Sequence, residues 1–363
     1  MKKQTQEWTS RRAIVRALAI AAAALGLSLS AGAAIAQAGP AKAPPVKIKF
    51  ALDWRFEGPS AFFLLPLEKG YFAQEGLDVS IDAGTGSSTT VNRVASGAYD
   101  MGFADLGAMI EFIANNPAAG TNRMQAVYMV YEQAPLAIFS LKKSHIDKPS
   151  DLVGKTLGSP VFDPTRKLFS LFTKANNIDA SRLTWKSMDP TLREAMLVRG
   201  DVDAVTGFYF TSLMNLYARG VKDEDISSMQ FVDYGVKMYG NAIVANQSFI
   251  ASNPKAVAAF LRAFTRGARE VLADPDGAIK YVHNRDPLID DAVENRRLKL
   301  AISSAIGTPN VRLNGMGAVD QSRVAEMVKQ VAAAFDLKQT PDPAAMFNAG
   351  FLPPKAERQV FSK

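Results

Sequence analysis

Short strand-like segments alternate with helix-like segments along the first part of the chain, and this alternation most limits what it can fold into. Residues 46–52 alternate apolar and polar side chains, which predicts a strand, and residues 60–69 predict a helix. The order repeats, with strands predicted at 77–81 and 101–104 and a helix at 88–96 between them. A repeated strand–helix order is typical of a mostly parallel sheet with helices on both faces.

A second series of the same kind begins after His145. It comprises a strand ending at Gly158, a helix at 165–175, a strand at 183–186, a helix at 191–199, a strand at 204–206, a helix at 211–219 and a closing strand at 231–234. From Asn253 onward the pattern is almost wholly helical. Two similar series predict two α/β lobes with a cleft between them, and ligands of open α/β sheets bind beyond the carboxyl ends of the strands.

The first 38 residues predict an export signal. They hold four of the seven net positive charges, ahead of an Ala-rich apolar run at 17–35. The tripeptides 34–36 and 36–38 match the A-x-A pattern of a cleavage site, so we expect cleavage near Ala36 or Ala38. Residues 10–16 resemble a twin-arginine signal, and the choice between that route and the general one stays open. An uncleaved membrane anchor is the alternative.

Export and cleavage divide the chain into five expected parts. These are the signal at 1–38, a flexible leader at 39–45, lobe 1 at 46–138, lobe 2 at 139–238, and a return to lobe 1 with C-terminal helices at 239–363. The processed protein is expected in the periplasm. Its remaining charge is only +3 and is spread along the chain, so we expect no nucleic-acid partner.

The chain contains no cysteine, which excludes disulfides, Cys-ligated metal centres and thiol nucleophiles. The two histidines, His145 and His283, lie in no predicted cleft loop, and no G-x-S-x-G motif is present. We therefore expect no enzyme activity, no metal and no cofactor.

Two loops that follow predicted strands carry groups suited to a ligand. Residues 53–59 place an aromatic ring, a guanidinium and two carboxylates directly after the first strand. Residues 84–90, rich in Gly, Ser and Thr, precede a helix, whose free N–H groups attract an anion. This second loop has neither Walker nor G-x-G-x-x-G spacing. Core packing for the aromatics and simple turns for the glycines are the competing interpretations.

These segments carry a resemblance to a known family. The matching text is ALDW at 51–54, EKGYF at 68–72, EGLDV at 75–79, GTGS at 84–87, VASGAYDMGFAD at 94–105, SDLVGK at 150–155 and VRGDVDA at 198–204. In this order and spacing it resembles the periplasmic binding proteins of ABC importers for nitrate, alkanesulfonates, taurine and thiamine-precursor pyrimidines. The resemblance implies a type II periplasmic-binding fold, in which two α/β lobes joined by hinge crossovers close on a ligand.

The sequence departs from the pyrimidine-binding branch of that family. The branch usually continues from Asp-Trp to Pro-Asn and a later His, whereas residues 55–59 read RFEGP. Related enzymes that make the thiamine pyrimidine use a Cys-rich iron site and their own histidine, whereas this chain has no cysteine and no histidine in a predicted cleft loop. Such a synthase, or a ligand-sensing partner of a membrane receptor, is the alternative to solute binding.

The candidate ligand-binding residues follow the predicted strands or lie near the crossovers. In lobe 1, the ligand's rim and face are assigned to Asp53, Trp54, Phe56 and Glu57, its anionic group to Gly86, Ser87 and Ser88, the third strand's end to Ala104 and Asp105, and the hinge to Glu132 and Gln133. In lobe 2 and the return crossover, the candidates are Ser159, Phe162, Asp163, Arg166, Asp189, Gly207, Phe208, Tyr209, Tyr239 and Asn241. Arg166 would offer a counter-charge.

The resulting expectation is an extracytoplasmic solute-binding component of an ABC importer. It would act as a monomer, capture a small anionic solute with a planar or aromatic part by lobe closure, and deliver it to the permease's transmembrane subunits. Sulfonates, aromatic carboxylates, pyrimidines, flavin-like rings and small anions stay open as ligands.

Overall fold

A computed structural model describes residues 44–116, 123–337 and 339–361. The expected export signal and most of the expected leader lie outside the described residues. Within the described part, no helix combines the length and the apolar character needed to cross a membrane.

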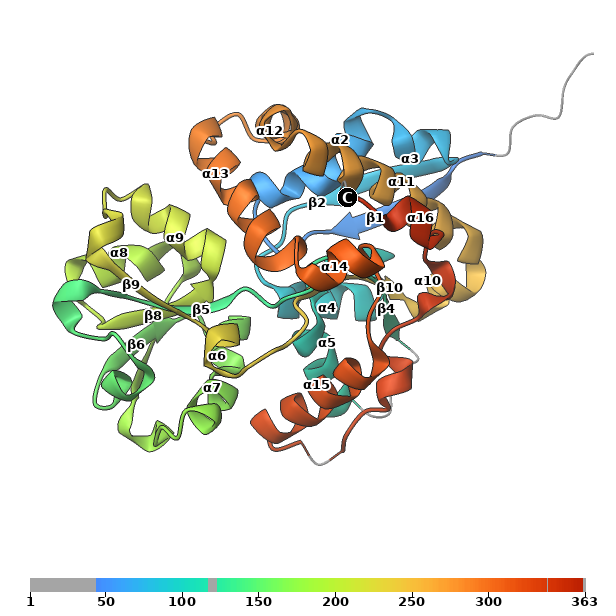
Figure 1. The fold of residues 1–363 in the computed structure, drawn as a ribbon. Helices are drawn as coiled ribbons and strands as arrows, with labels where there is room; N and C mark the ends of the chain where they lie inside the picture. The colour runs from blue at the N-terminus through green and yellow to red at the C-terminus, as the bar shows by residue number, and fades with distance from the viewer. Residues whose placement is uncertain (1–43, 117–122, 338, 362–363) are drawn as a thin grey trace, which may run out of the picture. The chain divides into compact units, whose positions relative to one another are not determined.

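Ten strands form two five-stranded sheets, drawn in Figure 1. The first sheet has the order β2-β1-β3-β10-β4 and the second β7-β6-β8-β5-β9. Their bounds are β1 Val46–Ala51, β2 Leu77–Asp82, β3 Met101–Asp105, β4 Met124–Met129, β5 Leu136–Leu141, β6 Thr156–Ser159, β7 Thr184–Ser187, β8 Ala204–Phe208, β9 Ile226–Gln230 and β10 Asn241–Asn246.

The helices follow the strands in both series and then fill the C-terminal part. They are α2 Ala61–Glu68, α3 Tyr71–Gln74, α4 Ser87–Ala95, α5 Leu106–Asn115, α6 Pro164–Lys167, α7 Phe169–Ala175, α8 Arg193–Arg199, α9 Tyr209–Tyr217, α10 Gln247–Ser252, α11 Pro254–Ala273, α12 Pro275–Arg285, α13 Asp291–Ala301, α14 Pro309–Asn314, α15 Gln321–Ala334 and α16 Lys355–Arg358.

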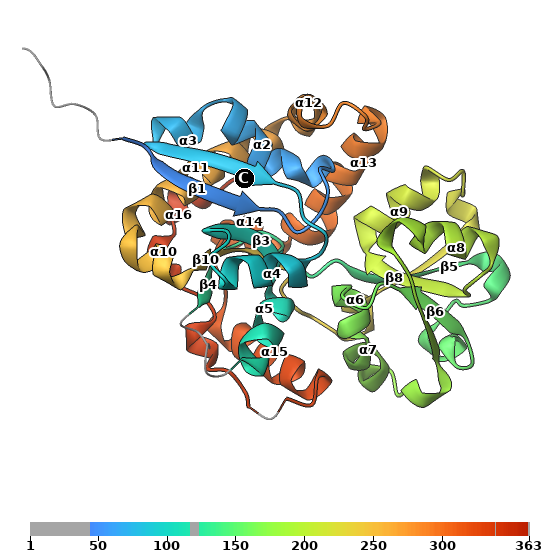
Figure 2. The same ribbon diagram turned by 180° about the vertical axis from the view of Figure 1, so that it is seen from behind.

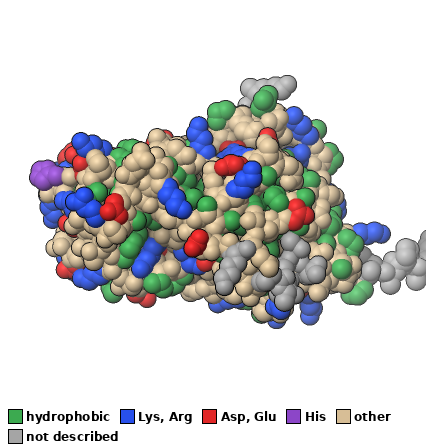
Figure 3. Space-filling model, turned by 90° about the horizontal axis from the view of Figure 1, so that it is seen from below, with side chains coloured by type: hydrophobic (Ala, Val, Ile, Leu, Met, Phe, Trp, Pro, Cys, Tyr) green, Lys and Arg blue, Asp and Glu red, His purple; other side chains and the backbone are tan. Residues whose placement is uncertain are grey.

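Each sheet is covered on both faces. Helices α2, α3 and α11 lie on one face of the first sheet and α4, α5 and α15 on the other, as Figures 1 and 2 show from opposite sides. Two clusters of buried apolar side chains correspond to these two faces. In the second sheet, α8 and α9 lie opposite α6 and α7 in both views. On the face drawn in Figure 3, acidic and basic side chains are interspersed and form no single-sign patch.

Both sheets are mostly parallel, as the strand–helix order predicted, but each contains one strand that runs against the other four. The pairs β1–β2, β1–β3, β6–β7 and β6–β8 are parallel, as expected of strands joined through helices. By contrast, β10 runs antiparallel to β3 and β4, and β5 runs antiparallel to β8 and β9. Strands β5 and β10 each follow a passage between the sheets, and so enter their sheets in the opposite direction.

The prediction of a closing strand at 231–234 was wrong. That strand ends earlier, as β9 at Gln230, and Phe231–Tyr234 forms a short 3-10 helix. Gly235 follows at φ 90°, a conformation that glycine adopts without steric cost and that lets the chain turn back toward the first sheet. The expected helix at 165–175 is also interrupted, because α6 ends at Lys167 and α7 begins at Phe169.

Two crossovers join the sheets side by side. The chain leaves β4 through residues 130–135 and returns to β10 through residues 235–240. The backbone N–H of Ala134 donates to Met238 O at 2.9 Å, and that of Gly240 donates to Tyr131 O, also at 2.9 Å. These bonds make the crossovers a two-stranded connection, which is the hinge that the periplasmic-binding fold requires.

Candidate functional site

A pocket lies where the loops after β1 and β2 meet the loops after β6 and β8. The space between its walls measures about 740 Å³, counting the part open to solvent. Its lining residues are Leu52, Asp53, Trp54, Arg55, Glu57, Pro59, Ser60, Phe63, Gly86, Ser87, Phe103, Tyr131, Pro160, Phe162, Asp163, Pro164, Arg193, Phe208, Phe210 and Thr211. Both lobes therefore contribute to one cavity.

Two glycines allow the loops of the first lobe to approach each other. The N–H of Gly84 donates to Trp54 O at 2.9 Å and that of Gly86 to Asp53 O at 2.7 Å. A Cβ on Gly84 would stand only 2.1 Å from the carbonyl oxygen of Leu52, so no other residue fits there. Gly86 has a φ of 135°, and a Cβ there would lie 3.0 Å from the ring of Phe162 in the second lobe. These glycines set the width of the pocket.

The carboxyl of Asp53 is the centre of a polar cluster on lobe 1. Its Oδ2 accepts from the side-chain amide of Asn241 at 2.7 Å and from the hydroxyl of Ser87 at 3.3 Å. The Ser87 hydroxyl in turn accepts from the backbone N–H of Asp105 at 3.1 Å. Desolvation, together with the charge of Glu57, raises the pKa of Asp53 to about 7 despite these hydrogen bonds. Desolvation likewise raises the pKa of Asp105 to about 6.

A buried guanidinium faces the pocket from lobe 2. Arg193, at the start of α8, is 3% exposed. It contacts Asp163 Oδ2 at 3.3 Å and Glu194 Oε1 at 2.8 Å. Gly207 makes room for it, because a Cβ there would lie 2.7 Å from Nη1 of Arg193. Desolvation still raises the pKa of Asp163, although the charge of Arg193 opposes that shift.

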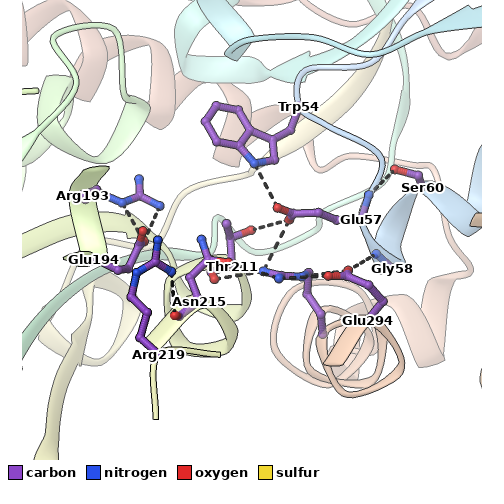
Figure 4. Close-up of polar contacts among 11 residues, drawn as sticks. Trp54, Glu57, Gly58, Ser60, Arg193, Glu194, Thr211, Asn215, Arg219 and Glu294 are labelled. Carbon is purple, nitrogen blue, oxygen red and sulfur yellow. Dashed lines mark hydrogen bonds and ion pairs between the residues drawn. The ribbon is translucent and has the colours of Figure 1, made fainter. Parts of the chain in front are cut away.

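A second buried guanidinium, that of Arg297 on α13, connects the rim of the pocket with lobe 2. It lies 3.5 Å from Glu57 Oε2 and 2.9 Å from Glu294 Oε2, and donates to the carbonyl of Thr211 at 2.9 Å. Glu57 also accepts from Trp54 Nε1 at 3.2 Å and from the Thr211 hydroxyl at 3.3 Å. Figure 4 shows Trp54 and Glu57, from the loop after β1, meeting Thr211 of α9. The orientation of Trp54 is thus linked to helix α9 of lobe 2.

The structure brings eight of the predicted residues together in the pocket. They are Asp53, Trp54, Glu57, Gly86, Ser87, Phe162, Asp163 and Phe208. Asn241 and Asp105 do not line it but contact residues that do. A role in ligand binding stays a prediction for all of them.

Apart from the two hinge residues, four predicted lobe 1 residues lie outside the pocket lining. Phe56 packs against the core beneath the guanidinium of Arg285, whose carbon lies 5.1 Å from the ring centre. Ser88 lies within α4 and Ala104 is buried in β3. The carboxyl of Asp105 caps α5 by accepting from the N–H of Ala108 at 2.9 Å. Packing and capping occupy these positions, which the sequence pattern could not separate from ligand contact.

The predicted hinge residues hold the crossovers instead of lining the cavity. Glu132 is bonded by Arg323 and, at 3.1 Å, by Asn310. Arg323 also lies over the ring of Tyr239 at 4.0 Å. Gln133 donates to the carbonyl of Ser304 at 3.2 Å. One arginine of α15 therefore contacts both crossovers.

The remaining lobe 2 candidates also do not line the pocket. Arg166 donates to the carbonyl of Ser159 at 2.8 Å and lies over the ring of Trp185 at 4.8 Å. Asp189 caps a short 3-10 helix through the N–H of Thr191. Gly207 is in β8, and Tyr209 stacks on Phe139 at 6.0 Å. The counter-charge expected from Arg166 is supplied to Asp163 by Arg193.

Several residues that line the pocket were not predicted from the sequence. Arg193 lay in a predicted helix, and Phe63 and Phe103 lay in apolar runs with no polar signal. Tyr131 reaches the pocket from the first crossover. A local signal existed for Arg55, in the loop 53–59, and for Phe210, between the predicted strand at 204–206 and the helix from 211. No group of three or more His, Cys, Asp or Glu side chains placed to hold a metal ion occurs within 44–116, 123–337 and 339–361.

Two mixed α/β sheets, a pair of crossovers and a pocket between the lobes define the periplasmic-binding fold. The structure is similar to the periplasmic aliphatic sulphonate binding protein SsuA of Escherichia coli, with a TM-score of 0.64 and 12% identity over 83% of this chain and 92% of that one. At that identity the likeness shows the fold alone.

The chain belongs to the NMT1/THI5 like family, whose model matches residues 59–278. It is 28% identical to the formylaminopyrimidine-binding protein of Halalkalibacterium halodurans over 278 residues, which cover 75% of this chain and 81% of that protein. It is also 27% identical to the 4-amino-5-hydroxymethyl-2-methylpyrimidine phosphate synthase of Aspergillus parasiticus over 261 residues, covering 69% of this chain and 74% of that protein. The family thus contains both binding proteins and enzymes.

Proposed function

We propose that this protein is the periplasmic solute-binding component of an ABC importer and that it captures a small planar heterocycle between its lobes. The observation that carries the proposal is one pocket with aromatic walls from both lobes, including Trp54, Phe103 and Phe162, and with a few polar groups between them. Lobe closure would then present the ligand to the permease. The name of the Halalkalibacterium relative favours an aminopyrimidine-like ring among such ligands.

The arrangement around Ser87 argues against the anionic group that the sequence analysis expected at residues 86–88. The Ser87 hydroxyl donates to the carboxyl of Asp53 and so is not free to bind an anion. Glu57 and Asp163 add two more carboxylates to the lining. A ligand that offers hydrogen-bond donors fits this wall better than a sulfonate or a nitrate does.

The experiment that tests solute capture identifies the ligand and follows its fate. Mass spectrometry of protein purified from its native host should detect a bound small molecule, and adding that molecule back should raise the melting temperature. The recovered ligand should be chemically unchanged after long incubation. Turnover would instead favour an enzyme of the synthase type. Delivery to a permease predicts that cells lacking this protein lose uptake of the same molecule.

The Trp54→Ala variant should bind the ligand at least tenfold more weakly, because it removes the largest aromatic surface of the first loop. Titration calorimetry measures the effect. Trp185→Ala is the matched control, since Trp185 packs edge-on against Phe169 outside the pocket. Equal affinities for the Trp54→Ala variant and the native protein would remove the first loop from the site.

A further inference from the structure

The planar heterocycles that the pocket could hold differ in their net charge. Resting on the function proposed above, we infer that the cleft takes its ligand as a cation: a flat ring bearing a protonated amine or an amidinium-like edge. The geometry that points to this class is an excess of buried carboxyls over guanidinium groups, combined with hydrogen-bond acceptors that have no partner.

The charged groups in and behind the pocket are unevenly balanced. Six buried or half-buried carboxyls stand against two buried guanidinium groups. The carboxyls are Asp53, Glu57, Asp105, Asp163, Glu194 and Glu294, and the guanidinium groups are Arg193 and Arg297. Each arginine is already shared by two carboxylates. Asp53 and Asp105 have no salt-bridge partner among the described residues.

The other positively charged side chains near the pocket do not offset the excess of carboxyls. Arg55 is exposed and lies against the Trp54 ring at 5.4 Å, so water screens its charge. Arg166 is bonded to the carbonyl of Ser159 and stacked on Trp185. Lys167 is paired with Glu111 at 2.7 Å. A positive charge from the ligand is therefore the missing partner of the buried carboxyls.

Burying an ionised carboxylate without a cation beside it costs free energy. Such a carboxyl therefore tends to keep its proton until a cation binds next to it. The pKa of Asp53 is about 7 and that of Asp105 about 6, both because of desolvation. Desolvation also raises the pKa of Asp163 and of Glu294. The pKa is thus raised at four of the six carboxyls. A bound cation would lower these pKa values again and release protons.

Two of the buried acceptor atoms without a partner lie behind Asp53 and Ser87 on lobe 1. The Oδ1 of Asn241 and the Oδ2 of Asp105 are buried and accept no hydrogen bond within the described part of the chain. Both residues are fully buried, and they lie opposite each other on β10 and β3. The amide nitrogen of Asn241 donates one of its hydrogens to Asp53, while the amide oxygen accepts none. These acceptors lie directly behind Asp53 and Ser87, which line the pocket, so a ligand ammonium with its three donors suits this part of the site.

The aromatic walls of the pocket also favour a positively charged ligand. Trp54, Tyr131 and Phe162 line the pocket beside the acidic end. The face of an aromatic ring attracts a cation, most strongly where water is excluded. An anion in the same position would meet the carboxyls of Asp53, Glu57 and Asp163, whereas the lining guanidinium of Arg55 is exposed to water.

The test compares two pyrimidines that differ only in charge. The probes are 4-amino-5-aminomethyl-2-methylpyrimidine, whose side chain is an ammonium at neutral pH, and the 5-hydroxymethyl compound, which is neutral and of similar size. Titration calorimetry at pH 7.5 and low salt should show the ammonium compound binding at least tenfold more tightly. Equal affinities, or tighter binding of the alcohol, would overturn the inference.

Two variants test whether Asp53 is responsible for the preference for the ammonium compound. Asp53→Asn should reduce the ratio of the two affinities to less than threefold, because it removes a charge and keeps the shape. Asp78→Asn is the matched control, since Asp78 is exposed on β2, and it should leave the ratio unchanged. An unchanged ratio in Asp53→Asn would also count against the inference.

If neither pyrimidine binds, the ligand carried through native purification decides. A ligand that is cationic at pH 7 supports the inference, whereas a neutral or anionic one overturns it. Failure of solute capture gives a different signal, which is chemical conversion of the ligand during incubation. The charge preference can still be measured in that case, because the initial titration does not depend on turnover.

Discussion

The Arg297→Met variant is expected to melt about 5–10 °C below the native protein. Arg297 is 3% exposed and is the cation that contacts both Glu57 and Glu294. Removing one partner of a buried ion pair leaves an uncompensated charge and typically costs about 3–5 kcal/mol. In a chain of this size, each kcal/mol corresponds to roughly 2 °C in melting temperature.

The neighbouring residue provides the control for this loss. Arg296 is exposed and lies over the ring of Tyr217 at 4.7 Å, so Arg296→Met should change the melting temperature by no more than about 2 °C. The double variant Glu294→Gln with Arg297→Met should recover part of the lost stability, because it removes one stranded carboxylate. Scanning calorimetry measures all three. Equal shifts for the two single variants would contradict the ion-pair role assigned to Arg297.

The Asp53→Asn variant is expected to be more stable than the native protein at pH 8, in the absence of ligand. The pKa of Asp53 is about 7 in the folded protein and 3.8 in the unfolded chain. Between these values the unfolded state releases the proton and the folded state keeps it, so native stability falls as pH rises and is lowest above about pH 7. The full difference corresponds to about 4 kcal/mol.

The same variant carries its own control at low pH. Near pH 4 most of the pKa-linked cost is absent, so the two proteins should differ much less than at pH 8. Urea unfolding at both pH values measures the difference, and a gain of more than about 1 kcal/mol at pH 8 is expected. A variant that is destabilised at pH 8, or that differs equally at both pH values, would show that Asp53 is not strained by ionisation.

The strands around the hinge show which elements could be predicted from sequence patterns and which could not. The segments rich in alternating or periodic apolar residues were located correctly, including β1, β2, α4 and α11. The two strands that follow the crossovers, β5 and β10, were not predicted, because both are fully buried and show no alternation. Their antiparallel direction follows from the passage between sheets, which no local window contains.

Some residues of the pocket were likewise predicted from the sequence, and others were not. Trp54, Ser87 and Phe162 follow predicted strands, and this position alone placed them near a cleft. Arg193 was missed because an arginine in a helix normally faces water, whereas here Gly207 and two carboxylates give it a buried place. Phe56 and Tyr209 were assigned to the site because aromatic residues in loops look alike whether they meet a ligand or the core.

The sequence by itself determined the order of strands and helices and therefore the loops from which a ligand site could form. Local periodicity encodes which face of each segment is buried, and it is readable without knowing the partners. The tertiary structure decided the direction of the crossover strands, the sharing of Arg193 and Arg297 between carboxylates, and the protons held by Asp53. These properties depend on desolvation and on contacts between residues far apart in the chain, and neither is present until the chain has folded.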